Sequence, residues 1–119
     1  MIGPSSWIAM FCNYLPPAES DFLSVWEQHP TTFKCIKMFG KDVALPRYQQ
    51  AYGISYLFSG ISSEAIPPTE RILSIQQNLN MLISESSFVF NMCLCNWYEP
   101  HHYIGPHSDD TRQLVLEHP

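Results

Sequence analysis

The sequence has little charge and lacks the features that define several common protein classes. Only 14% of its 119 residues are charged and 45% are hydrophobic. Soluble domains usually have about 25% charged residues, so this composition excludes disorder caused by charge. There is no repeat, no run of about 18 apolar residues and no basic secretory signal. We therefore expect one folded unit inside the cell, nuclear or cytoplasmic, with no membrane partner.

Basic residues are few, because the chain has six Lys and Arg and a net charge of −5. Four of them nevertheless fall within fourteen positions, at Lys34, Lys37, Lys41 and Arg47. Such a local cluster could contact a phosphate backbone, although its residues could equally form an ordinary solvated surface. Charge alone leaves both interpretations open.

The four cysteines do not form the pattern of a disulfide framework, because Cys12 and Cys35 stand far from Cys93 and Cys95. Cys93 and Cys95 share one face of a predicted strand. Packing of two buried thiols is the favoured interpretation. The alternative is a zinc site that joins both thiols to His101, His102 or His107.

Ten prolines argue against a long helical bundle and favour strands, turns and short helices. Apolar spacing predicts a helix over 18–28 and a second helix that begins after Pro67-Pro68-Thr69. Extended segments are predicted at 33–39, ended by a turn at 40–42, and from Pro46 to Gly60. The run Phe88–Tyr98 is apolar on both faces, which predicts a central strand covered on both sides. Asn96 and Tyr98 form the polar end of one face.

His107 and Asp109 are two residues apart, so a strand would present both side chains on one face. An imidazole and a carboxylate at this spacing are two thirds of the 2-His-1-carboxylate triad that holds iron(II) in non-haem oxygenases. Alone, this pair is a weak signal.

An ordered series of motifs resembles the AlkB-like family of Fe(II)- and 2-oxoglutarate-dependent dioxygenases. The first block is Met38-Phe39-Gly40-Lys41, Pro46-Arg47, Tyr52-Gly53 and Tyr56-Leu57-Phe58-Ser59-Gly60, which resembles the nucleotide-recognition segment of the DNA-repair branch. The second block is Phe90-Asn91, Leu94-Cys95-Asn96-Trp97-Tyr98, Ile104-Gly105 and His107-Ser108-Asp109-Asp110, which resembles the family's core strand and metal motif.

The resemblance implies a role for seven residues. His107 and Asp109 would be the first two iron ligands, and Asn96 and Tyr98 would hydrogen-bond 2-oxoglutarate. The residues that would meet the nucleic acid are Tyr56 and Phe58 in the base pocket, and Arg47 near the DNA backbone.

The implied fold is α+β, mainly β: the N-terminal and first part of a double-stranded β-helix, or jelly-roll, with flanking helices. Residues 1–119 would form a single, incomplete domain, with a nucleotide-recognition segment at about 33–60 and the start of the catalytic core at about 88–119. The implied reaction removes alkyl groups from nucleic-acid bases, in DNA or RNA, and consumes 2-oxoglutarate and dioxygen.

The sequence also departs from the family pattern. Only ten residues follow Asp109, and neither Arg112 nor His118 matches the position of a 2-oxoglutarate arginine or of the distal iron ligand. We therefore expect little or no independent activity from this chain. The alternative hypothesis is a non-catalytic module that keeps only the nucleic-acid-binding half, and an oxygenase of proteins or lipids also remains open.

Overall fold

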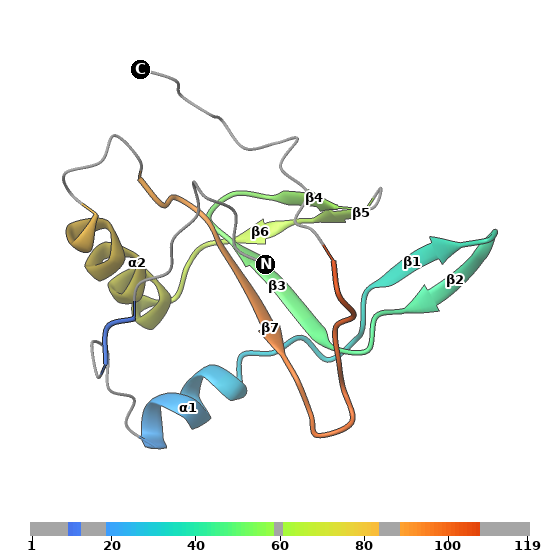
Figure 1. Cartoon of the computed structure of the whole chain (residues 1–119), viewed down its shortest axis with the longest axis horizontal. Coiled ribbons are helices and arrows are strands. Elements are labelled where there is room, and N and C mark those ends of the chain that lie inside the picture. Colours follow the sequence, from blue (N-terminus) through green and yellow to red (C-terminus); the bar gives the residue numbers. More distant parts are fainter. Residues whose placement is uncertain (1–9, 13–18, 59–60, 84–88, 108–119) are drawn as a thin grey trace.

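The computed structural model describes residues 10–12, 19–58, 61–83 and 89–107 of the chain (Figure 1). Two helices and seven short strands occur in these ranges. The helices are α1 (Glu19–Trp26) and α2 (Glu70–Leu82). The strands are β1 (Cys35–Met38), β2 (Lys41–Ala44), β3 (Tyr48–Tyr52), β4 (Tyr56–Phe58), β5 (Ile61–Ser63), β6 (Ala65–Ile66) and β7 (Cys93–Trp97).

The main sheet has three strands in the order β6-β3-β7. β3 and β7 are antiparallel and pair from Tyr48 opposite Trp97 to Tyr52 opposite Cys93, whereas β6 runs parallel to β3. Within the described residues β7 therefore lies at a sheet edge, and four of its five residues are only half-buried. The central, doubly covered position expected for this strand is wrong in this part of the chain. Trp97 at the end of this run packs against α1, so a helix covers one face of the strand.

The core lies where both helices meet the β3–β7 pair. Tyr52, Ile72 and Trp97 are the buried residues of this cluster, and Trp26 of α1 packs against them. The indole Nε1 of Trp97 donates to the backbone oxygen of Val25 at 2.8 Å, which joins β7 to α1. Trp26 and Trp97 are thus packing residues that join α1 to β7.

The helix predicted after Pro67-Pro68-Thr69 is confirmed as α2. Thr69 is its N-cap, and its hydroxyl accepts from the backbone nitrogen of Ile72 at 3.4 Å. Glu70 adds negative charge to the first turn, where the helix dipole favours it. These groups hold Ile72, the buried residue of α2, against Tyr52 and Trp97.

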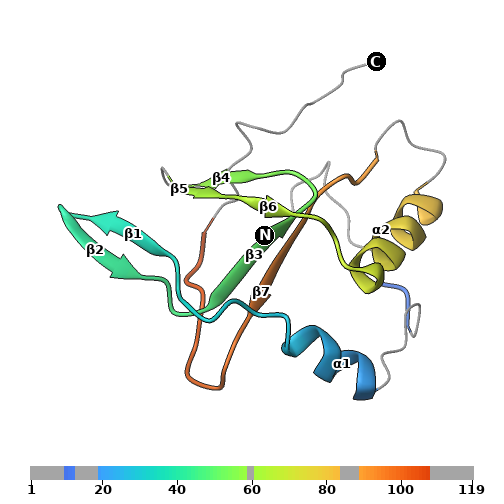
Figure 2. The ribbon, with the colours of Figure 1, turned by 180° about the vertical axis from the view of Figure 1, so that it is seen from behind.

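β1 and β2 form a separate hairpin that projects away from the helices and the main sheet, as seen from front and back (Figures 1 and 2). Met38 pairs with Lys41, so the turn consists of Phe39 and Gly40 alone. The turn predicted at 40–42 is therefore displaced, because Lys41 and Asp42 already belong to β2. Phe39 and Gly40 have φ angles of 51° and 75°, the pair of positive values that a two-residue type I′ turn requires.

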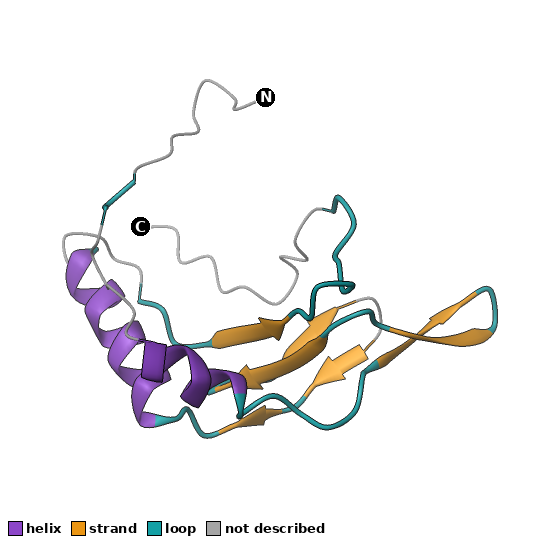
Figure 3. Ribbon diagram, turned by 90° about the horizontal axis from the view of Figure 1, so that it is seen from below, coloured by secondary structure: helices purple, strands orange, loops and turns teal. Residues whose placement is uncertain are grey.

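The described residues form a mainly β structure with the two helices on one side of the strands (Figure 3). The coarse α+β, mainly β class is thus confirmed. Neither α1 nor α2 is long and apolar enough to cross a membrane.

Two glycines with positive φ provide a matched test of the packing around β3. Gly53, with φ 86°, follows β3, and an added Cβ there would lie 2.8 Å from the backbone oxygen of Asn91. Gly40, with φ 75°, has nothing within 4 Å of such an atom. We expect Gly53→Ala to lower the free energy of unfolding by clearly more than Gly40→Ala, whose backbone cost alone is about 1 to 2 kcal/mol. Urea denaturation of both variants measures this difference, and equal losses would contradict the packing.

Candidate functional site

Asn96 of β7 is held by two side chains from the neighbouring segment. Its Oδ1 accepts from Arg47 Nε at 3.1 Å and from Gln49 Nε2 at 2.9 Å. Gln49 lies directly opposite Asn96 in the β3–β7 register. With Oδ1 occupied by two donors, the amide orientation is determined by the hydrogen-bond network, and Nδ2 is directed as a donor. A carboxylate is the kind of group that such a donor can bind.

Arg47 is only 8% exposed. The structure thus brings together the predicted DNA contact Arg47 and the predicted 2-oxoglutarate contact Asn96, a pairing that sequence reasoning did not foresee. The role of Arg47 at DNA stays a prediction, since its Nε is directed into the protein. Lys34 is likewise engaged, because its Nζ donates to Ser63 Oγ at 2.6 Å, and burial lowers its pKa against the opposing effect of Glu64.

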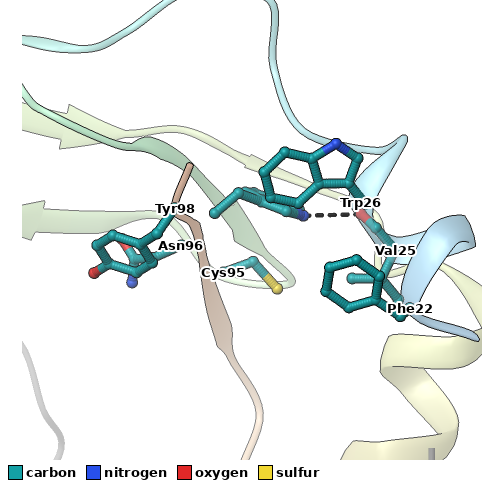
Figure 4. Close-up of a pocket in the computed structure, with 7 residues that line it drawn as sticks. Phe22, Val25, Trp26, Cys95, Asn96 and Tyr98 are labelled. Atoms are coloured by element: carbon teal, nitrogen blue, oxygen red, sulfur yellow. Dashed lines mark hydrogen bonds between the residues drawn. The ribbon is translucent and has the colours of Figure 1, made fainter. Parts of the chain in front are cut away.

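A cavity of about 380 Å³ lies between α1 and β7. Figure 4 shows Asn96 and Tyr98 on one side of β7, with Cys95 and the side chains of α1 on the other. The residues that line the cavity are Phe22, Val25, Trp26, Cys95, Asn96, Trp97 and Tyr98. The cavity is therefore mostly apolar, and the side chains of Asn96 and Tyr98, the two residues predicted to hold 2-oxoglutarate, lie on the other side of β7 from α1.

His107 is exposed, and its Nδ1 lies 2.8 Å from the carbonyl oxygen of Gly105. A carbonyl can only accept, so this bond places the imidazole proton on Nδ1 and leaves the lone pair on Nε2. Metal-binding histidines commonly have this arrangement. Asp109 and His118 lie outside the described residues. Tyr56 is half-buried on β4, which belongs to a different sheet from Asn96. Phe58 is the last residue of β4, and the structure does not describe its side chain.

Phe39 is a candidate contact residue that sequence reasoning did not select individually. Its side chain is 100% exposed at the tip of the β1–β2 hairpin. A phenylalanine with positive φ is unusual, since glycine or asparagine suits such turns better, and such backbone exceptions cluster at functional sites. Lys37 and Lys41 lie beside it on the hairpin surface, where Lys37 pairs with Asp42 at 3.3 Å. The sequence did hold a signal for this contact residue, because Phe39 directly precedes the turn glycine Gly40 and lies between Lys37 and Lys41.

The thiols of Cys93 and Cys95 are half-buried, and their sulfur atoms are 3.6 Å apart. The hydrogen bond between them lowers the pKa of Cys93 to about 7, although burial opposes this shift. The same bond, with burial, raises the pKa of Cys95. In the described part of the chain, Glu99, His101 and His102 form a metal-compatible group, and it includes neither thiol. Packing of the thiols against the core is thus favoured over the zinc alternative.

Comparison with known proteins relates the chain to oxidative demethylases. It is 31% identical to the DNA oxidative demethylase ALKBH2 of Bos taurus over 71% of this chain and 31% of that protein. It is also 31% and 30% identical to the proteins of that name from Homo sapiens and Mus musculus, each over 67% of this chain. No protein-family model matches the chain.

These alignments place the matched part of the chain in the AlkB-like family. The relatives to which it is similar are the mammalian ALKBH2 proteins. The match spans about a third of the length of these relatives.

Replacement of Asn96 tests the network at the site. Asn96→Ala removes the acceptor of Arg47 and Gln49 and leaves two buried donors without it, so we expect a loss of about 1 to 3 kcal/mol in the free energy of unfolding. Asn96→Asp keeps an acceptor beside the guanidinium and should lose less stability. Denaturant melts of both variants give the comparison, and an Asn96→Ala variant as stable as the wild type would refute the network.

Proposed function

We propose that this chain carries the nucleotide-recognition part and the first part of the catalytic core of an Fe(II)- and 2-oxoglutarate-dependent dioxygenase that dealkylates nucleic-acid bases. The similarity to DNA oxidative demethylases over two thirds or more of the chain carries this proposal. Its context would be a jelly-roll catalytic domain and an intracellular location, with alkylated DNA as the substrate.

The donor chemistry around β7 suits the co-substrate. The directed Nδ2 of Asn96 and the half-exposed hydroxyl-bearing ring of Tyr98 can donate to carboxylate or keto oxygens of 2-oxoglutarate. Both side chains lie on the side of β7 that faces away from α1, so the co-substrate would bind on that side. The role of Arg47 is then to hold Asn96 in position.

The state of His107 fits an iron(II) ligand. Its Nδ1–H is held by the carbonyl of Gly105, so Nε2 can bind the ion while the ring orientation is maintained. Asp109 would add the carboxylate. Iron(II) held by these residues would supply the oxidation of an N-methyl group by dioxygen, in which 2-oxoglutarate becomes succinate and carbon dioxide and the methyl carbon leaves as formaldehyde.

The hairpin supports a nucleic-acid substrate. An exposed aromatic ring on a projecting turn can insert between bases or stack on an unpaired one, and such stacking contributes about 1 to 3 kcal/mol per base. Lys37 and Lys41 can meet phosphates beside it. An enzyme that acts on an extruded base needs contacts of this kind to hold the distorted duplex.

Turnover tests the catalytic part of the proposal. The chain is incubated with iron(II), 2-oxoglutarate and an oligonucleotide that contains 3-methylcytosine, and the released formaldehyde is measured. We expect little or no release from this chain, and any release should be abolished by His107→Ala and by Asp109→Ala, while both variants keep the oligonucleotide affinity of the wild type. Release that persists in His107→Ala would contradict the assigned ligand.

Binding tests the hairpin. We expect Phe39→Ala to weaken binding of the alkylated oligonucleotide by about 5- to 150-fold, the equivalent of about 1 to 3 kcal/mol. Met81→Ala, at a residue that is 72% exposed near the end of α2, is the matched control and should bind normally. Fluorescence anisotropy provides the affinities. No oligonucleotide binding at all would contradict both the enzyme fragment and the non-catalytic binding module.

A further inference from the structure

We propose that Glu99, His101 and His102 form a binding site for a divalent transition-metal ion of the zinc class, separate from His107 and Asp109. These three residues lie in the turn that directly follows β7. Their potential ligand atoms all lie within 4.8 Å of one another. The site would hold a structural ion that closes the turn.

The two separations from Glu99 to the imidazoles are close to those of a metal centre. Glu99 Oε2 lies 3.6 Å from His101 Nε2 and 3.8 Å from His102 Nε2. Zinc ligands at about 2.0 to 2.1 Å from the ion in a tetrahedron are about 3.3 to 3.4 Å apart. The carboxylate therefore has to approach each imidazole by only a few tenths of an ångström to share one ion with them.

The turn is anchored to the protein at His102 and is open to solvent at His101. The backbone nitrogen of His102 donates to the oxygen of Glu99 at 2.9 Å, and that of Tyr103 donates to the oxygen of Pro46 at 3.2 Å. The ring of His102 is only 4% exposed and packs edge-on against Phe33 and Tyr48. His101, whose side chain is 75% exposed, faces solvent and provides the entry path. Packing thus fixes the position of the His102 ring, and the exposed ring of His101 can close over the ion.

Binding would change the proton position on His102. Without metal, its Nδ1 accepts from the backbone nitrogen of Glu99 at 3.1 Å, so its proton resides on Nε2, toward the Glu99 carboxylate. An ion at Nε2 requires the proton on Nδ1, and the Glu99 amide must then turn away. The loss of this one neutral hydrogen bond is small compared with the gain from three metal–ligand bonds. The backbone amide of Glu99 is therefore a specific reporter of binding.

The donor set determines the class of ion. Two imidazoles and one carboxylate suit Zn²⁺ and its neighbours in the transition series, whereas Ca²⁺ and Mg²⁺ prefer oxygen ligands alone. Three protein ligands leave the fourth tetrahedral position for water.

The experiment uses the full chain with His107→Ala and Asp109→Ala, so that the predicted iron ligands are absent. Zn²⁺ is titrated by calorimetry, and we expect one equivalent to bind, with a rise in melting temperature and a shift of the Glu99 amide resonance. His101→Ala in this background should weaken zinc binding at least about tenfold, because it removes a direct ligand. Because His101 is exposed, this variant should keep the fold. Glu99→Gln should act in the same direction.

Two controls distinguish this site from the thiols. Cys93→Ser in the same background should leave zinc affinity unchanged, and bound Co²⁺ should give visible d–d bands without the near-ultraviolet charge-transfer band of a thiolate ligand. Failure of the chain to bind Zn²⁺ at micromolar concentration would overturn the proposal. Zinc binding that is insensitive to His101→Ala, or that is lost with Cys93→Ser, would also overturn it.

Discussion

The antiparallel pairing of β3 with β7 is the constraint on which the rest of this structure depends. These strands are far apart in the sequence, yet their register brings Gln49 opposite Asn96 and Tyr48 opposite Trp97. Trp97 is 5% exposed, and its indole bond to Val25 attaches the pair to α1. A shift of one residue would turn Trp97 out of the core and Asn96 away from Gln49, so core packing and the polar network enforce the same register.

The same pairing places the polar end of β7 beside the segment that leads into β3. Asn96 receives its hydrogen bonds from Arg47 and Gln49, and the turn after β7 is tied back to Pro46. Residues that sequence reasoning assigned to different tasks, at DNA and at 2-oxoglutarate, therefore form one network. We infer that a change in the position of Arg47 also shifts Asn96, and the reverse, because an amide held by two fixed donors has little freedom to reorient.

Unlike the buried network around Asn96, the β1–β2 hairpin exposes most of its side chains to solvent. Its tip carries Phe39 in a backbone conformation that costs free energy for a bulky residue, and the ring makes no compensating contribution to the core. Packing within the described residues does not explain such an arrangement, whereas contact with a partner, as in the proposed function, would explain it. In the proposed function that partner is nucleic acid, and Lys37 and Lys41 provide the complementary charge.

The sequence by itself determined the features that depend on neighbours in the chain. Helix α2 was predicted from its apolar spacing after Pro67-Pro68-Thr69, and the order of the motifs indicated the family. Both signals lie in short continuous segments of the sequence. The tertiary structure alone decided the edge position of β7, the engagement of Arg47 with Asn96, and the exposure of Phe39. Strand pairing and side-chain burial depend on contacts between residues far apart in the chain, and local periodicity carries no information about which partner a strand or a guanidinium will meet.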